Sequence, residues 1–131
     1  MTVEQFLSEM AGTANRHEFE AHMNLISKDV KVYGVPEFDV ITYDDWYNQC
    51  KQEFADRLLL RVTYQGVQTL SETEDEIRFA AVETVEATDG QENINIVEFT
   101  IQKDVDGQWR LVLLSIVSKV EAEDDEDLKV Q

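Results

Sequence analysis

The sequence predicts an α+β fold in which N-terminal helices precede a meander of long antiparallel strands. Helix signals occur in the first half of the chain, where capping residues precede apolar residues at helical spacing. The second half contains β-branched runs separated by two Asp-Gly dipeptides, which are strong hairpin signals. The last run, Trp109–Val120 (WRLVLLSIVSKV), is apolar on both faces, so we expect it to be covered on both sides.

The first two helices are predicted from capping signatures. Thr2 and Gln5 have the spacing of a capping box, and we expect the helix to end or bend at Gly12. Asn15 and Glu18 repeat this spacing and indicate a second helix start. Apolar residues at helical spacing continue that helix: Phe19, Met23 and Ile26.

A third helix is predicted after a short strand over residues 30–33. Thr42 has the features of an N-cap, and Ile41 with Trp46 fits a hydrophobic staple around it. Trp46, Cys50 and Phe54 then follow at a spacing of four, so they share one face of the helix. We expect this face to pack on the rest of the domain.

Four long strands follow, and their turns define a meander. The predicted runs are Leu58–Leu70, Glu76–Ala87, Asn93–Lys103 and Trp109–Val120. A straight strand of this length would extend about 40 Å, so we expect the sheet to curve strongly. Gly66 is a candidate β-bulge that would help it to bend.

Composition limits the class of protein. The 131 residues suit one domain, which we place at 1–120, with 121–131 as an acidic C-terminal tail. A net charge of −17 argues against nucleic acid and anionic membrane surfaces as partners. A single cysteine excludes an intrachain disulfide, and we recognise no signal peptide and no membrane span. We therefore expect a cytoplasmic protein.

The order of these elements resembles the nuclear transport factor two-like superfamily, which includes the SnoaL-like polyketide cyclases and ketosteroid isomerase. The resemblance covers most of residues 3–120 and rests on LISKDVKVYGVP, the capped third helix and the hairpin VDGQWRLVLLSIVSK. It implies three N-terminal helices packed on a strongly curved, mainly antiparallel sheet, the cone-shaped, cystatin-like arrangement. It also implies an apolar pocket inside the cone and a homodimer through the convex sheet face.

The isomerase branch of this superfamily uses a tyrosine and two aspartates, and the resemblance places other residues there. Met10 occupies the tyrosine position, Gly34 lies near the base and Phe99 lies near the acid that binds the oxyanion. Since that mechanism needs a carboxylate and two donors, we do not expect this chain to perform it.

Two-residue turns at both Asp-Gly sites give a provisional register. One sheet face then carries an apolar set, which the resemblance makes the concave face: Ala80, Val82, Val97, Phe99, Ile101, Val112, Leu114 and Ile116. The opposite face carries Tyr64, Glu83, Glu98 and Ser115. Glu83 and Glu98 there could form an acid–base pair, or they could lie on a solvated or dimer-facing surface. A shift of one residue would exchange the two faces.

The candidate ligand pocket contains seven residues: Met10, Trp46, Phe54, Val97, Phe99, Leu114 and Ile116. The alternative is that these residues simply fill the core. The one weak catalytic candidate is His22, whose imidazole could act as an acid or base or could be a plain core-edge histidine. The cysteine and histidines do not cluster, so we predict neither a metal site nor a cofactor.

In the last strand, we expect Trp109, Leu111, Leu113 and Val117 to face the second subunit. We therefore predict a non-catalytic SnoaL-like domain that binds a small hydrophobic ligand. The first alternative is an enzyme of the same fold, a cyclase, dehydratase or isomerase, that uses His22 or a pocket carboxylate. The second is a protein-interaction module whose pocket is filled by its own side chains.

Overall fold

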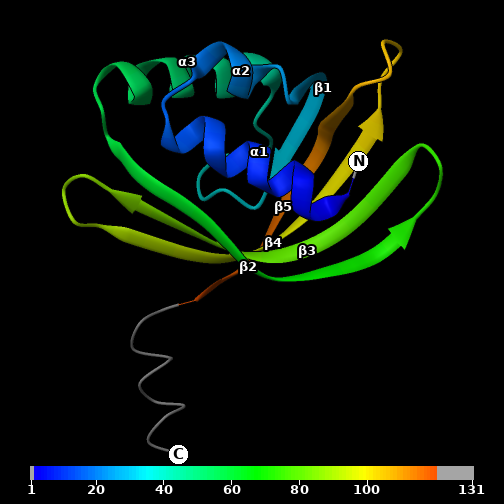
Figure 1. The fold of residues 1–131 in the computed structure, drawn as a ribbon. Coiled ribbons are helices and arrows are strands. Elements are labelled where there is room, and N and C mark those ends of the chain that lie inside the picture. Colours follow the sequence, from blue (N-terminus) through cyan, green and yellow to red (C-terminus); the bar gives the residue numbers. More distant parts are fainter. Residues whose placement is uncertain (1, 121–131) are drawn as a thin grey trace, which may run out of the picture.

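The computed structural model describes residues 2–120 as three helices and one five-stranded sheet (Figure 1). The elements in chain order are α1 (Val3–Asn15), α2 (Phe19–Met23), β1 (Ile26–Tyr33), α3 (Tyr43–Ala55), β2 (Leu59–Glu72), β3 (Glu76–Ala87), β4 (Glu92–Lys103) and β5 (Trp109–Val120). The α+β prediction is confirmed. The predicted acidic tail over residues 121–131 lies outside the described residues.

The sheet is mixed and has the strand order β1-β5-β4-β3-β2. Strands β2 to β5 form the predicted antiparallel meander, and β1 adds to β5 in parallel. Figure 1 shows the sheet curved, with the helices over its concave face. The long strands bend at several register shifts, one of them at Gly66, where the predicted bulge is present.

The first helix begins as predicted but ends later. Thr2 and Gln5 form both hydrogen bonds of the capping box. The helix continues through Gly12 and ends where His17 adopts a left-handed φ of 56°. Glu18 N–H donates to the Thr13 carbonyl and His17 N–H donates to that of Ala14, which is a Schellman motif. The helix therefore does not end at Gly12, where an end or a bend was predicted, because the left-handed residue that closes it is His17 and not a glycine.

Asn15 does not cap the second helix. Its side chain donates to the Val62 carbonyl over 3.1 Å and accepts from the Val62 N–H over 2.7 Å. This pair of bonds ties the end of α1 to β2. The second helix consequently starts only at Phe19 and has five residues, and Ile26 lies in β1 rather than on the helix. Phe19 and Met23 do lie on the helix, but Ile26, the last residue of the predicted apolar face, is the first residue of β1.

The third helix matches its prediction closely. Thr42 is the N-cap, and its N–H donates to the Asp45 carboxylate over 3.1 Å. The helix ends in a second Schellman motif, in which Leu58 N–H donates to the Glu53 carbonyl and Arg57 has a φ of 53°. Trp46 and Cys50 of the predicted apolar face pack against the buried core.

Both Asp-Gly hairpins have three-residue turns instead of the predicted two. Ala87 N–H donates to the Gln91 carbonyl over 2.8 Å, and Gly90 takes the left-handed conformation that closes such a loop. The extra residue shifts β3 by one position, so Phe79 stands opposite Phe99. Ala80 and Val82 therefore face away from the helices. The prediction from a two-residue turn, which placed them on the concave face, was wrong.

The second hairpin contains a compensating irregularity. Its three-residue turn pairs Ile101 with Leu111, and a register shift follows on the next pair, Thr100 with Leu113. Val112 is the extra residue of this bulge and lies outside the core. Leu111 is fully buried in the core, so the expectation that it faces a second subunit was wrong. Beyond the bulge, the inward placement of Leu114 was correct.

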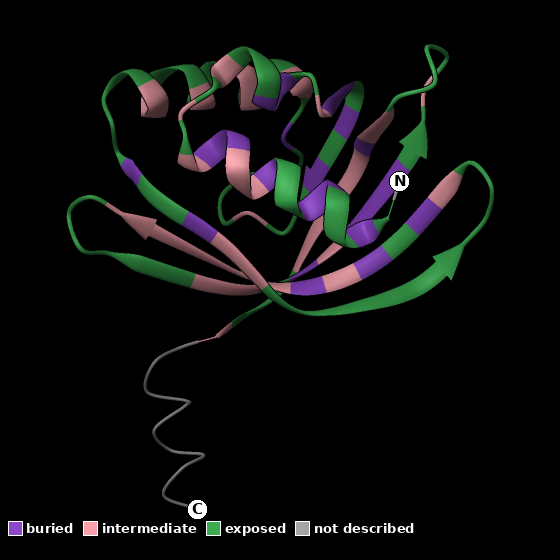
Figure 2. Ribbon diagram, in the orientation of Figure 1, coloured by how far each residue is buried: buried purple, intermediate pink, exposed green. Residues whose placement is uncertain are grey.

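The core lies between the helices and the concave face of the sheet, as the buried residues in Figure 2 show. Its centre is a stacked pair of rings, Phe79 and Phe99, whose centroids lie 4.8 Å apart. Phe6 from α1 covers them and is likewise fully buried. The concave face is thus filled at its middle.

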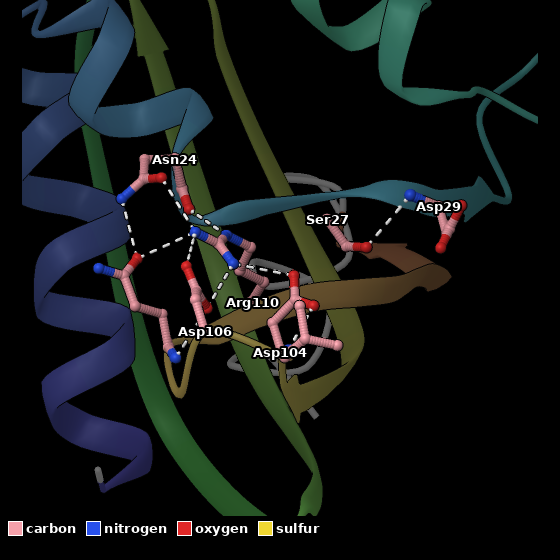
Figure 3. Close-up of polar contacts among 8 residues, drawn as sticks. Asn24, Ser27, Asp29, Asp104, Asp106 and Arg110 are labelled. Carbon is pink, nitrogen blue, oxygen red and sulfur yellow. Dashed lines mark hydrogen bonds and ion pairs between the residues drawn. The ribbon is translucent and has the colours of Figure 1, made fainter.

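Arg110 joins the β4–β5 turn to the loop before β1 (Figure 3). Its guanidinium donates to Asp104 over 2.8 Å and to Asp106 over 2.9 and 3.0 Å. Its Nε donates to the Asn24 carbonyl over 2.9 Å. The hydrogen bonds from Arg110 lower the pKa of Asp106. Arg110 therefore holds the Asp-rich β4–β5 turn against the loop before β1.

Replacing Arg110 with methionine is expected to lower the free energy of unfolding by about 2 kcal/mol, because several charge-assisted hydrogen bonds are lost together. The measurement is urea denaturation at neutral pH. The matched control is Arg78→Met, which breaks an exposed 3.7 Å pair with Glu98 and should cost less than about 0.5 kcal/mol. Equal effects of the two substitutions would show that the Arg110 hydrogen bonds stabilise the fold no more than an exposed ion pair does.

Among the described residues, no helix is long and apolar enough to cross a membrane.

Candidate functional site

A cavity of about 310 Å³ lies between the helices and one end of the concave sheet face. Most of its lining is apolar, with side chains from all three helices and four of the strands. The apolar lining consists of Met10, Ala14, Val32, Val35, Ile41, Trp46, Phe54, Leu59, Val62, Val85 and Leu114. The polar lining consists of His22, Gln49, Cys50, Glu53, Tyr64 and Glu83. An apolar cavity with a few convergent polar groups has the character of a small-molecule site.

Four of the seven predicted pocket residues line this cavity: Met10, Trp46, Phe54 and Leu114. Val97 and Phe99 do not line it, because both are buried in the packed core. Ile116 lines a neighbouring hollow instead. The sequence therefore located the helical wall of the cavity and misplaced part of its floor.

Tyr64 and Glu83 are the polar groups that the sequence register placed on the wrong face. The two residues stand opposite each other on β2 and β3, and the Tyr64 hydroxyl donates to a Glu83 carboxylate oxygen over 3.0 Å. Burial raises the pKa of Glu83, although the Tyr64 hydrogen bond acts to lower it. Burial and the neighbouring Glu83 also raise the pKa of Tyr64 well above its ordinary value. Glu98 lies on the other face beside Arg78, so of the two alternatives for Glu83 and Glu98 the structure excludes the acid–base pair.

His22 reaches the cavity from α2 and contacts Thr13 of α1. Its Nδ1 lies 2.9 Å from the Thr13 hydroxyl, and that hydroxyl donates its proton to the Glu9 carbonyl over 2.7 Å. With its proton directed at Glu9, the hydroxyl can accept from Nδ1–H, and in that tautomer Nε2 is the unprotonated nitrogen of the neutral ring. Burial lowers the pKa of His22 to about 4, against a raising effect of the Met10 backbone. At neutral pH the ring is an uncharged hydrogen-bond acceptor.

Cys50 is a structural thiol in this setting. It lies on the cavity face of α3 between Trp46 and Phe54, as the helical spacing predicted. Burial and, to a smaller extent, the neighbouring Glu53 carboxylate raise the pKa of the Cys50 thiol to about 12. Because the thiolate is the reactive form, the thiol is inert at neutral pH.

The three positions that the isomerase resemblance singles out carry no acid or base. Met10 lines the cavity, and Phe99 lies in the core. Gly34 has a φ of +91°, and a Cβ there would come within 2.4 Å of the Ile116 carbonyl oxygen. A carboxylate cannot be placed at Gly34 without moving β5. Glu83 and His22, which line the cavity, lie at other positions.

A second hollow of about 700 Å³ adjoins the cavity. The two share Gln49, Glu53, Leu59 and Val85 in their linings. The outer hollow continues along the end of β5 past Ile116. This arrangement gives the cavity a route to the surface.

The described residues contain no group of three or more histidine, cysteine or acidic side chains that could hold a metal ion.

No protein-family model and no curated protein matches the chain. Solved structures do match. A candidate dehydratase of the NTF2-like family from Streptomyces avermitilis has a TM-score of 0.71 at 16% identity, over 92% of this chain and 94% of that one. A candidate scytalone dehydratase from Novosphingobium aromaticivorans has a TM-score of 0.67 at 15% identity, over 91% and 82%. A candidate ketosteroid isomerase from Shewanella frigidimarina has a TM-score of 0.65 at 12% identity, over 85% and 90%.

The chain therefore has the fold of the nuclear transport factor two-like superfamily, which confirms the resemblance seen in the sequence. A related structure from Nostoc punctiforme, a protein of unknown function with a TM-score of 0.68, is described as having a cystatin-like fold. At these identities the likeness establishes the fold alone.

Proposed function

We propose that the protein binds a small, largely apolar molecule in the cavity between the helices and the sheet. The observation that carries this proposal is the cavity itself, about 310 Å³ of space with a mainly apolar lining and a route outward. Cavities of this kind are where small ligands bind in proteins, since they remove apolar surface from water while a few polar groups fix orientation. An open cavity also argues against an interaction module with a filled pocket.

Val85→Phe is expected to abolish ligand binding, because Val85 lines both the cavity and the hollow outside it and a larger side chain would obstruct the connection. The measurement is the thermal shift of wild type and variant with neutral apolar compounds such as phenylethanol. Thr84→Phe is the matched control, since the adjacent residue points to the other face of β3. The proposal fails if no apolar compound stabilises the wild type, or if Val85→Phe retains the full shift.

A second candidate function is acid–base catalysis in the same cavity. It is favoured by the presence of two groups with opposite roles, the Glu83 carboxyl with its raised pKa and the unprotonated Nε2 of His22. Dehydratases and isomerases need such groups, and proteins with these candidate activities share the fold. Turnover that is lost in both Glu83→Gln and His22→Asn would support an enzyme. If neither the wild type nor the variants show turnover, catalysis is refuted and ligand binding remains as the proposed function.

We also propose that the convex sheet face pairs with a second copy of the chain. Among the described residues no helix covers this face, and half-exposed apolar side chains lie along its centre, including Val82, Ile94 and Ile96. Two chains of charge −17 repel each other, so the dimer should tighten as salt is added. Sedimentation at low and high salt tests this, and a monomer at both would refute it.

A further inference from the structure

The polar groups that line the cavity mostly offer hydrogen-bond acceptors. One oxygen of Glu83 accepts from Tyr64, and the other makes no hydrogen bond among the described residues. His22 uses its only N–H on Thr13 and presents the unprotonated Nε2. Tyr64, the hydroxyl donor of the lining, has its proton on Glu83. A ligand group that pairs with Glu83 or with His22 must therefore bring the donors itself.

The cavity also has an unbalanced charge. It is lined by two carboxylates, Glu53 and Glu83, and none of the described residues in its lining is a lysine or an arginine. His22 adds no positive charge at neutral pH, because burial lowers its pKa to about 4. An ion that enters this cavity to balance the carboxylates must be a cation.

Glu83 differs from two neighbouring glutamates of the sheet, each of which pairs with an arginine. Glu86 pairs with Arg61 over 3.4 Å, and Glu98 pairs with Arg78 over 3.7 Å. Both of these carboxylates lie on the face away from the cavity. Glu83, on the cavity side, has the Tyr64 hydroxyl as a partner and no ion pair among the described residues. A buried carboxylate without a counter-charge is costly, so a cationic ligand would gain by pairing with it.

We infer that the cavity selects an apolar amine in its ammonium form, with the ammonium group beside Glu83 and the apolar part among the rings and aliphatic side chains of the lining. This inference rests on the proposed binding function. An ammonium supplies the donors that Glu83 and His22 lack, and the aromatic rings of Trp46, Phe54 and Tyr64 can stabilise a cation. The net charge of −17 draws cations toward the protein and repels anions.

Neutral and anionic ligands fit this lining less well. A carboxylate ligand would meet two carboxylates and no lysine or arginine among the described residues of the lining. A neutral alcohol has one donor and leaves the charge of Glu83 unbalanced. The preferred order is therefore amine, then alcohol, then acid.

Calorimetric titration with three compounds of one shape tests the inference: phenethylamine, phenylethanol and phenylacetate. We expect phenethylamine to bind wild type about tenfold or more tightly than phenylethanol, and phenylacetate to bind most weakly. Glu83→Gln keeps an acceptor for the Tyr64 hydroxyl but removes the charge. It should reduce the affinity for the amine about tenfold and change that for the alcohol less than about threefold.

Glu98→Gln is the matched control, because it removes the same charge from the other face of the sheet. It should leave amine affinity within about twofold, since the Glu98 charge lies on the other side of the sheet from the cavity and is paired with Arg78. Equal affinities for amine and alcohol, or an amine preference that survives Glu83→Gln, would overturn the amine assignment and leave the binding function standing. Failure of all three compounds and of the apolar thermal-shift compounds would overturn both.

Discussion

Replacing Phe99 with alanine is expected to lower the free energy of unfolding by about 3–5 kcal/mol, since the change removes a ring from the centre of the core and leaves a cavity. Phe99 is 1% exposed, stacks on Phe79 and meets the edge of the Tyr64 ring at a centroid distance of 5.7 Å. The loss of the ring contacts adds to the loss of buried apolar surface. Urea denaturation of wild type and variant measures the effect.

Phe38→Ala provides the matched control, because Phe38 is 58% exposed in the loop before α3. This substitution should change stability by less than about 0.5 kcal/mol. A small loss in Phe99→Ala, comparable to that of the control, would mean that Phe99 does not lie in a packed core. It would then support the interpretation made from sequence, in which Phe99 lines the pocket.

The second large effect concerns pH. Burial lowers the pKa of His22 from 6.5 to about 4 in the folded protein. As pH falls between these two values the unfolded chain takes up a proton on this histidine and the folded chain does not. The contribution of His22 to stability is therefore complete above pH 6.5 and is lost as pH falls toward about 4. A shift of this size corresponds to at most about 3 kcal/mol.

His22→Asn isolates this contribution, because an asparagine can still donate to the Thr13 hydroxyl but does not titrate. The acidic residues titrate in both proteins, so the difference between the two stability curves reports His22. We expect the wild type to lose about 2–3 kcal/mol more than the variant as pH falls from about 6.5 to about 4. Parallel curves would show that His22 is solvated and does not lie in the wall of the cavity.

The sequence predicted the elements of this fold better than their connections. Helix starts were accessible because their signals are local: Thr2 and Thr42 each bond within their own first turn. The end of the first helix could not be predicted, because the left-handed residue that closes it is His17, whereas the sequence signal for such a residue is usually a glycine. Asn15 was misread for a different reason. Its true partner, the backbone of Val62, lies 47 residues away in the chain.

The candidate site depended on one turn. Asp89-Gly90 predicts a hairpin, but the same dipeptide fits a two-residue loop and a three-residue loop that ends in glycine. The difference of one residue moves Glu83 from one face of β3 to the other, because side chains alternate along a strand. The apolar face of α3 that lines the cavity with Trp46 and Phe54 could be predicted from the sequence. Glu83, the strand carboxylate that faces this wall, could not.

The most direct test of the central claim is an amide and indole NMR titration of the protein with phenethylamine. The chain has two tryptophans: Trp46 lines the cavity, whereas Trp109 packs against the core away from it. If the cavity is the binding site, the indole signal of Trp46 will shift to saturation while that of Trp109 stays in place. A Trp46 signal that moves with neither phenethylamine nor phenylethanol, or equal shifts of both indoles, would contradict a binding site in this cavity.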